Sequence, residues 1–106
     1  MIFNDQTSEF LGLELAVFQL KDGVTEAQLI ALSREVDDKF LSREEGLLSH
    51  FLLKGKDGHY ADVAIATTQA KAEEICQLWL HNDAAQEYLE LIDQDSVDMS
   101  FWSRIN

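Results

Sequence analysis

The chain has 106 residues, of which 8 are Lys or Arg and 20 are Asp or Glu, so its formal net charge is −12. Such an acidic chain is a poor partner for nucleic acid or for an anionic membrane surface, since both attract basic proteins. Hydrophobic residues make up 46% of the chain, which is enough to build one packed core. We predict an N-terminal arm over residues 1–12 and a single domain over residues 13–106.

The single cysteine excludes an intramolecular disulfide framework, and no cysteine–histidine cluster indicates structural zinc. The first 13 residues contain Asp5 and Glu9 but no Lys or Arg, unlike a secretory signal. No stretch has the roughly 20 apolar residues that a membrane-spanning helix needs. We therefore predict a cytoplasmic protein that contacts no membrane.

Residues 13–20 are predicted to form a strand that is apolar on both faces. One face carries Leu13, Leu15 and Val17, and the other carries Ala16, Phe18 and Leu20. Because both faces are apolar, this strand is expected at the centre of a sheet.

A helix is predicted to begin at Thr25, where Thr25 and Gln28 have the spacing of a capping box. Apolar residues follow at helical spacing and define one buried stripe, namely Leu29, Leu32, Val36 and Phe40. The charged residues at positions 35 and 37–39 are expected mostly off this stripe.

Residues 46–54 and 59–67 are predicted to form a hairpin, because Asp57-Gly58 between two apolar runs is a strong turn signal. A short turn would pair Lys54 with His59. That pairing places His50 opposite Val63, so His50 and Asp62 would share a face only after a one-residue change in register.

A second helical region is predicted to start at Thr68 and to break near residues 81–83, where Asn82 or Asp83 could cap a further piece. Residues 97–105 are predicted to form the last strand. The order β-α-β-β-α-β is that of an α+β, ferredoxin-like two-layer sandwich. Right-handed crossovers would place the first and third of these strands at the centre and both helical regions on one face. The other face would remain apolar, which predicts a homodimer.

Two segments, residues 57–63 (DGHYADV) and 91–99 (LIDQDSVDM), resemble small uncharacterised proteins of the dimeric α/β-barrel superfamily, in the antibiotic-biosynthesis-monooxygenase-like group. The resemblance covers roughly residues 13–105. It implies that two ferredoxin-like protomers pair their sheets into a barrel, with a pocket in each protomer between sheet and helices. Some relatives are cofactor-free monooxygenases of polycyclic aromatics, and others degrade haem.

Haem-degrading relatives use an Asn, a Trp and a His at places that correspond here to Phe18, Ala66 and Leu89. None of these three side chains supplies the required chemistry, so haem degradation is not expected. Quinone-forming relatives also often have a Trp where this chain has Ala66. The resemblance therefore implies a fold more firmly than a reaction, and no cofactor is predicted.

The candidate catalytic residues are His50 and Asp62, because a neutral imidazole beside a carboxylate can act as a general base. The candidate ligand-binding residues are Phe18, Trp79 and Tyr88, which could line an apolar pocket. For His50 the alternative is a hydrogen-bonded histidine near the dimer seam, and for Trp79 and Tyr88 it is an ordinary place in the core. His59 and His81 are expected at the surface, so no metal site is predicted.

Trp102 and Arg104 on the last strand are candidate dimer-interface residues, because Trp and Arg often anchor interfaces. A guarded sheet edge is the alternative. The functional hypothesis is a small-molecule-binding protein resembling cofactor-free monooxygenases that act on small apolar or aromatic compounds. The alternative hypothesis is a non-catalytic homodimeric module for ligand binding or assembly.

Overall fold

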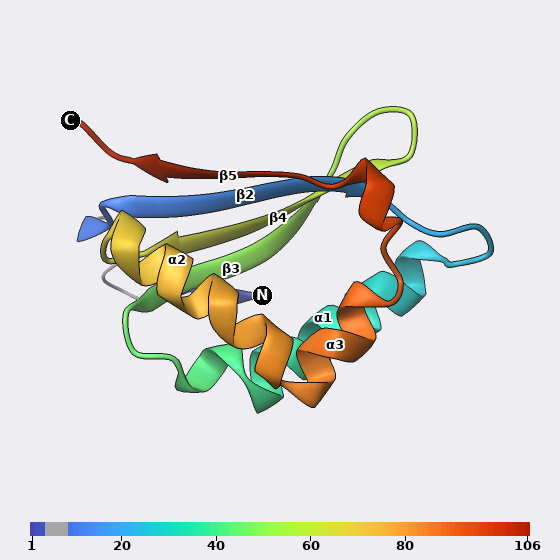
Figure 1. Cartoon of the computed structure of the whole chain (residues 1–106), viewed down its shortest axis with the longest axis horizontal. Helices are drawn as coiled ribbons and strands as arrows, with labels where there is room; N and C mark the ends of the chain where they lie inside the picture. The colour runs from blue at the N-terminus through green and yellow to red at the C-terminus, as the bar shows by residue number, and fades with distance from the viewer. Residues whose placement is uncertain (4–8) are drawn as a thin grey trace.

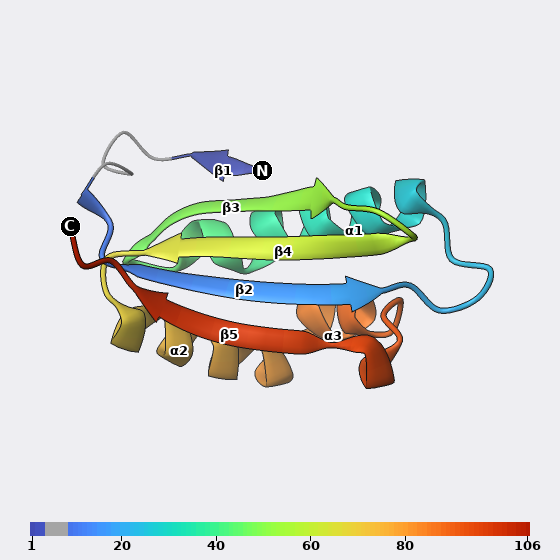
Figure 2. The ribbon, with the colours of Figure 1, turned by 90° about the horizontal axis from the view of Figure 1, so that it is seen from above.

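The computed structural model describes residues 1–3 and 9–106. Five antiparallel strands form one sheet, and the helices pack on one face of it (Figures 1 and 2). The strands are β1 (Ile2–Phe3), β2 (Gly12–Gln19), β3 (Leu47–Lys54), β4 (His59–Ala66) and β5 (Asp98–Ser103). The helices are α1 (Glu26–Lys39), α2 (Gln69–Leu78) and α3 (Asp83–Leu89), with 3₁₀ turns η2 (Leu41–Arg43), η3 (Trp79–His81) and η4 (Gln94–Ser96).

The strand order is β1-β3-β4-β2-β5, so β2 and β4 occupy the centre, as the crossover rule predicts. This arrangement confirms the α+β, ferredoxin-like fold. One strand was not predicted: Ile2 and Phe3 form β1, which pairs with His50 and Ser49 of β3. These two residues belong to the predicted arm over residues 1–12, of which residues 4–8 lie outside the described residues.

Helix α1 begins at the predicted capping box. The Gln28 amide donates to Thr25 Oγ1 at 3.2 Å, and the Thr25 amide donates to Gln28 Oε1 at 2.8 Å. The expected polar side of this helix needs one correction, because Asp37 is 5% exposed. Asp37 follows Leu29 by eight residues, so it shares the buried side of the helix with Leu29 and Ser33.

The second helical region breaks where the sequence predicts. Helix α2 ends at Leu78, η3 follows, and Asn82 caps α3 by accepting a hydrogen bond from the Ala85 amide at 3.0 Å. Strand β5 is shorter than predicted, since it ends at Ser103. Ile105 lies beyond it and is almost fully exposed.

The hairpin register differs from the prediction by one residue. His50 pairs with Ala64 rather than with Val63, and Lys54 pairs with Tyr60, with an irregularity between Leu47 and Ser49. The turn contains one more residue than assumed, because the Gly55 amide donates to the His59 carbonyl at 2.8 Å. The shift is the one-residue change that brings His50 to the same face as Asp62.

The two faces of the sheet differ in what covers them. The face toward the helices carries buried side chains, among them Glu14, Ala16, Phe18, His50 and Asp62. The opposite face has no helix over it (Figure 2). It presents mainly apolar side chains, namely Phe3, Leu13, Leu15, Val17, Phe51, Leu53, Val63, Ile65 and Trp102. We call these nine residues the bare face.

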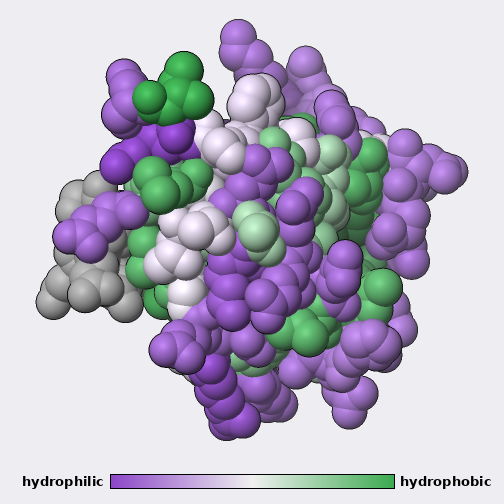
Figure 3. Space-filling view, turned by 60° about the vertical axis from the view of Figure 1, so that its left-hand side comes forward, coloured by the Kyte–Doolittle hydropathy of each residue, from purple (hydrophilic) through white to green (hydrophobic). Residues whose placement is uncertain are grey.

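The side of the molecule seen in Figure 3 is mostly covered by polar side chains. In the view of Figure 3, hydrophobic residues reach the surface in separate groups among hydrophilic ones. No helix within the described residues is long and apolar enough to cross a bilayer. The bare face is a contiguous apolar surface, and such surfaces usually mark a contact with another molecule.

Strand β2 and the start of α2 approach each other closely at Gly12. A Cβ added to Gly12 would lie 2.2 Å from the carbonyl carbon and oxygen of Thr68, and backbone atoms cannot yield as a flexible side chain could. We expect Gly12→Ala to lower the free energy of unfolding by about 2–3 kcal/mol, measured by urea denaturation. Gly55→Ala is the matched control, because its nearest neighbour would lie at 3.6 Å. Equal stability of the two variants would contradict the close packing.

Candidate ligand site

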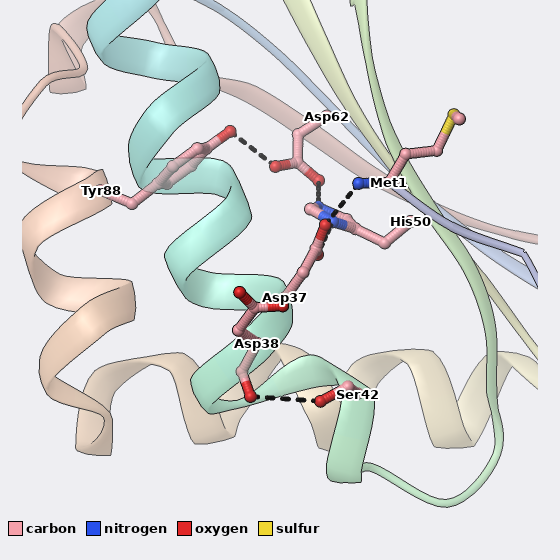
Figure 4. A network of polar contacts seen from close by, with 7 residues as sticks. All are labelled: Met1, Asp37, Asp38, Ser42, His50, Asp62 and Tyr88. Carbon is pink, nitrogen blue, oxygen red and sulfur yellow. Dashed lines mark hydrogen bonds and ion pairs between the residues drawn. The ribbon is translucent and has the colours of Figure 1, made fainter.

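A buried histidine lies between two carboxylates on the helix side of the sheet (Figure 4). His50 Nδ1 lies 2.6 Å from Asp37 Oδ1 on α1, and His50 Nε2 lies 2.8 Å from Asp62 Oδ1 on β4. The His50 side chain is fully buried. This one side chain therefore joins α1 to two neighbouring strands of the sheet.

The position of His50 fixes its charge. Burial by itself would lower the pKa of His50, but the charges of Asp62 and Asp37 and the hydrogen bonds to them raise it to about 10. Both ring nitrogens therefore carry protons at neutral pH, and each donates to one carboxylate. The neutral imidazole considered from the sequence is not the form that this environment favours.

Asp37 is held by a second positive group. The N-terminal ammonium of Met1 lies 2.7 Å from Asp37 Oδ2. Burial would raise the pKa of Asp37, but the hydrogen bonds from His50 and from this ammonium keep it below the ordinary value. Asp37 is thus an ionised carboxylate that anchors the imidazolium.

Asp62 connects the network to α3. Tyr88 OH donates to Asp62 Oδ2 at 2.6 Å, so each Asp62 oxygen accepts one hydrogen bond. Burial first, and then the negative charge of Asp62, raise the pKa of Tyr88 well above its usual range. Tyr88 is therefore a phenol that donates, and Asp62 keeps lone pairs for a further partner.

A cavity of about 310 Å³ lies between the sheet and the second helical region. It is lined by Glu14, Ala16, Asp62, Cys76, Gln77, Trp79, Leu80, Tyr88, Leu89, Ile92, Gln94, Val97 and Met99. The His50 network reaches this cavity at Asp62 and Tyr88, whereas His50 and Asp37 do not line it. The wall is mostly apolar with a few polar groups, which is the usual composition of a small-molecule site.

Glu14 is a site residue that the sequence analysis did not select. It lies on the buried face of β2, is 6% exposed and lines the cavity. Burial first, and then the nearby charge of Asp62, raise the pKa of Glu14 to about 7, and His50 opposes this shift. The strand alternation contained the signal, because Glu14 shares a face with Ala16 and Phe18.

The structure brings four of the five predicted site residues together. Asp62, Trp79 and Tyr88 line the cavity, and His50 lies behind Asp62. The rings of Trp79 and Tyr88 meet edge to face with centroids 5.4 Å apart. Phe18 instead packs in the core with its ring stacked on that of Tyr60, and it is not among the lining residues.

The two predicted interface residues lie near the end of β5. Trp102 is 58% exposed on the bare face, where it pairs with Leu13. Arg104 places its guanidinium 4.9 Å from the centroid of the Phe10 ring. Within residues 1–3 and 9–106, no group of three or more His, Cys, Asp and Glu side chains is arranged to hold a metal ion.

His50 is expected to stabilise the fold in a pH-dependent way. Its pKa is raised from 6.5 to about 10, so its contribution is complete below pH 6.5 and is lost as the pH rises through 10. We expect His50→Gln to cost about 3–5 kcal/mol at neutral pH, because it leaves the buried Asp62 without a counter-charge and Asp37 with the N-terminal ammonium alone. Urea denaturation near neutral pH and at about pH 10.5 should show a smaller difference from the native protein at the higher pH.

The control for this measurement is His59→Gln, which changes an exposed histidine at the hairpin. It should unfold like the native protein at both pH values. A His50→Gln deficit that stays constant between the two pH values would contradict a buried imidazolium.

No family model matches the chain, and no curated protein matches it. Solved structures do match. The chain is similar to SnoaB of Streptomyces nogalater, which is described as a cofactor-independent oxygenase. The two chains are 16% identical with a TM-score of 0.66, over 90% of this chain and 93% of SnoaB.

It is also similar to a dimeric ferredoxin-like protein from an uncultured marine organism, at 13% identity and a TM-score of 0.64, over 94% of this chain and 92% of the other. A third similar structure is an antibiotic biosynthesis monooxygenase, at 16% identity and a TM-score of 0.59, over 91% and 98% of the two chains. At such low identities, the TM-scores establish a shared fold and nothing further. The chain thus has the ferredoxin-like architecture of antibiotic-biosynthesis-monooxygenase-like proteins, as its resemblance to that group predicts.

Proposed function

We propose that the protein binds a small apolar or aromatic molecule in the cavity between the sheet and the helices. The observation that carries this proposal is the cavity itself, whose volume of about 310 Å³ is at the lower end of the range for small-molecule sites. The edge-to-face pair of Trp79 and Tyr88 offers aromatic surface to such a ligand. Asp62 offers it a buried carboxylate.

The chemistry that fits this arrangement is proton abstraction. Asp62 accepts a proton from an acidic C–H or O–H of the ligand, and His50 and Tyr88 hold its carboxylate in place. His50 is then a positioning residue, since it does not line the cavity. A cofactor-independent oxygenase such as SnoaB shows that this fold can serve oxidation.

An oxidation of this type balances without an external reductant. Deprotonation makes the ligand electron-rich enough to pass electrons to dioxygen. When a ring methylene becomes a carbonyl, one oxygen atom enters the product. The other oxygen atom leaves as water with the two methylene hydrogens. The protein then needs to supply only the base, the orientation and the apolar surroundings.

The cytoplasmic homodimer predicted from the sequence remains part of the proposal. The bare face has Leu15 and Val63 at its centre and exposes Phe3, Leu53 and Trp102. A second copy related by a two-fold axis would cover this surface with the same surface. One of the structures similar to this chain is described as dimeric, which supports the same arrangement.

The experiment on chemistry uses anthrone, a three-ring ketone with an acidic methylene. We expect anthrone to quench the fluorescence of Trp79 and to be oxidised with uptake of dioxygen. Asp62→Asn should retain the quenching and lower the oxidation rate at least about 100-fold, which is the usual contribution of a general base. Asp22→Asn is the control, because Asp22 is an exposed carboxylate in the turn between β2 and α1, away from the cavity and the bare face.

The outcomes separate the two functional classes. Quenching without oxidation above the spontaneous rate would favour the alternative, a non-catalytic homodimeric ligand-binding module. Absence of both quenching and oxidation would contradict a site for aromatic ligands in this cavity.

The homodimer is tested by a charge placed on the bare face. The native protein should have twice the mass of one chain by sedimentation equilibrium, and Leu15→Glu should give a folded monomer, because an unpaired carboxylate cannot be buried cheaply at an apolar interface. Leu78→Glu is the matched control, since Leu78 is an exposed leucine on α2 that does not line the cavity. A native monomer at micromolar concentration, or a Leu15→Glu dimer, would contradict this interface.

A further inference from the structure

Glu14 is a buried ionisable group of the cavity to which the proposed function assigns no role. Strand β2 brings Glu14 to the helix side at the point where it pairs with Ala64 of β4 and Phe101 of β5. Its side chain is more than nine-tenths buried and lines the cavity. A carboxyl group in this position loses most of its hydration without leaving the ligand space.

Glu14 also lacks the partners that the other buried carboxylates have. Asp37 and Asp62 each accept two short hydrogen bonds within the protein. Among the described residues, no hydrogen bond or ion pair satisfies the Glu14 carboxyl. No fully buried side-chain oxygen or nitrogen of the described residues lacks a partner, so the Glu14 oxygens keep access to the cavity. A group bound in the cavity can therefore supply the hydrogen-bond partner that the protein does not.

The charges around Glu14 decide what that partner can be. Asp62 faces it from β4, Tyr88 from α3 and the Cys76 thiol from α2. On this side β5 presents Met99, Phe101 and Ser103, none of which carries a charge. The positive charge of His50 lies behind Asp62 and is shared between Asp62 and Asp37. None of the described residues that line the cavity is Lys, Arg or His.

We propose that the ligand carries one protonated amino group on an otherwise apolar or aromatic frame, and that Glu14 binds this group. This inference rests on the proposed function, because it places the ligand in the same cavity. The amine supplies the hydrogen-bond donors and the positive charge that Glu14 lacks. Trp79 and Tyr88 add aromatic surface to which a cation is attracted.

The ionisation of Glu14 gives this ligand class a pH signature. The pKa of Glu14 in the empty cavity is about 7, so the group is about half protonated at neutral pH. An ammonium ligand binds the ionised form, whereas a neutral alcohol can bind either form. Affinity for the amine should therefore rise with pH from 6 to 8, while an alkylamine itself stays protonated over this range.

The test compares three probes that share one ring system: 2-naphthylmethylamine, 2-naphthylmethanol and 2-naphthoate. Calorimetry on the native protein at pH 8 should show the amine binding at least about tenfold more tightly than the alcohol, and the carboxylate should bind most weakly. The preference for the amine over the alcohol should fall about tenfold between pH 8 and pH 6.

The test variant is Glu14→Gln, which preserves shape and removes the charge. It should bind the alcohol as the native protein does and lose both the amine preference and its pH dependence. The variant is expected to fold, because it removes a buried carboxylate that is costly to ionise. Its unfolding temperature at pH 8 should be no lower than that of the native protein. Glu73→Gln on the exposed side of α2 is the control for the loss of one negative charge.

Each outcome decides the inference. A preference for the amine that disappears in Glu14→Gln and persists in Glu73→Gln supports it. Equal binding of amine and alcohol, or a preference that survives in Glu14→Gln, overturns it but leaves an apolar ligand site in place. If none of the three probes binds, the proposed ligand site fails together with this inference.

Discussion

The structure depends on a buried imidazolium placed between two aspartates. Taking three charged side chains out of water is expensive, and the arrangement is stable only because every partner is present with short hydrogen bonds. Asp37 on α1, His50 on β3 and Asp62 on β4 come from three different elements. The network therefore fixes how α1 lies on the sheet more specifically than apolar contacts would, since apolar contacts tolerate sliding.

The same network of hydrogen bonds connects the core to the wall of the cavity. Asp62 is bound on one side by His50 and on the other by Tyr88, so its carboxylate has little freedom to rotate. In the proposed proton abstraction, a carboxylate that is held in one orientation can meet the ligand without further ordering. Asp37 and His50 do not line the cavity, but Asp37 holds His50 and His50 holds Asp62 in this orientation. The stability of the fold and the geometry of the site are therefore coupled through the same three side chains.

Much of this fold follows from short-range signals. The capping box at Thr25, the Asp57-Gly58 turn and the cap at Asn82 each specify a boundary through local hydrogen bonds, and the element order then leaves few topologies. The hairpin register did not follow, because one additional residue in the turn changes every pair along β3 and β4. The placement of His50 beside Asp62 depended on that single residue, so the sequence could suggest the pair but not assign it.

The two missed carboxylates show a more general limit of pattern analysis. Asp37 and Glu14 lie at positions where helical and strand periodicity point inward, yet the sequence analysis places Asp37 mostly off the buried stripe and gives Glu14 no role. A charged residue at an inward position is costly unless something compensates for it, and periodicity cannot show the compensation. For Asp37 the compensation is visible in the protein, as His50 and the N-terminal ammonium.

For Glu14 no such compensation lies within the described part of the chain, which is why we propose a ligand-binding role for Glu14 and a structural one for Asp37. Evolution of a stable core alone would favour an apolar side chain at this position of β2, since Ala16 and Phe18 beside it are apolar. The carboxyl group at this position lowers stability when it ionises, because its pKa is raised in the folded protein. Such a local cost is expected at positions where binding, rather than folding, supplies the missing partner. The cavity wall at Glu14 is thus the part of this structure that a ligand would complete.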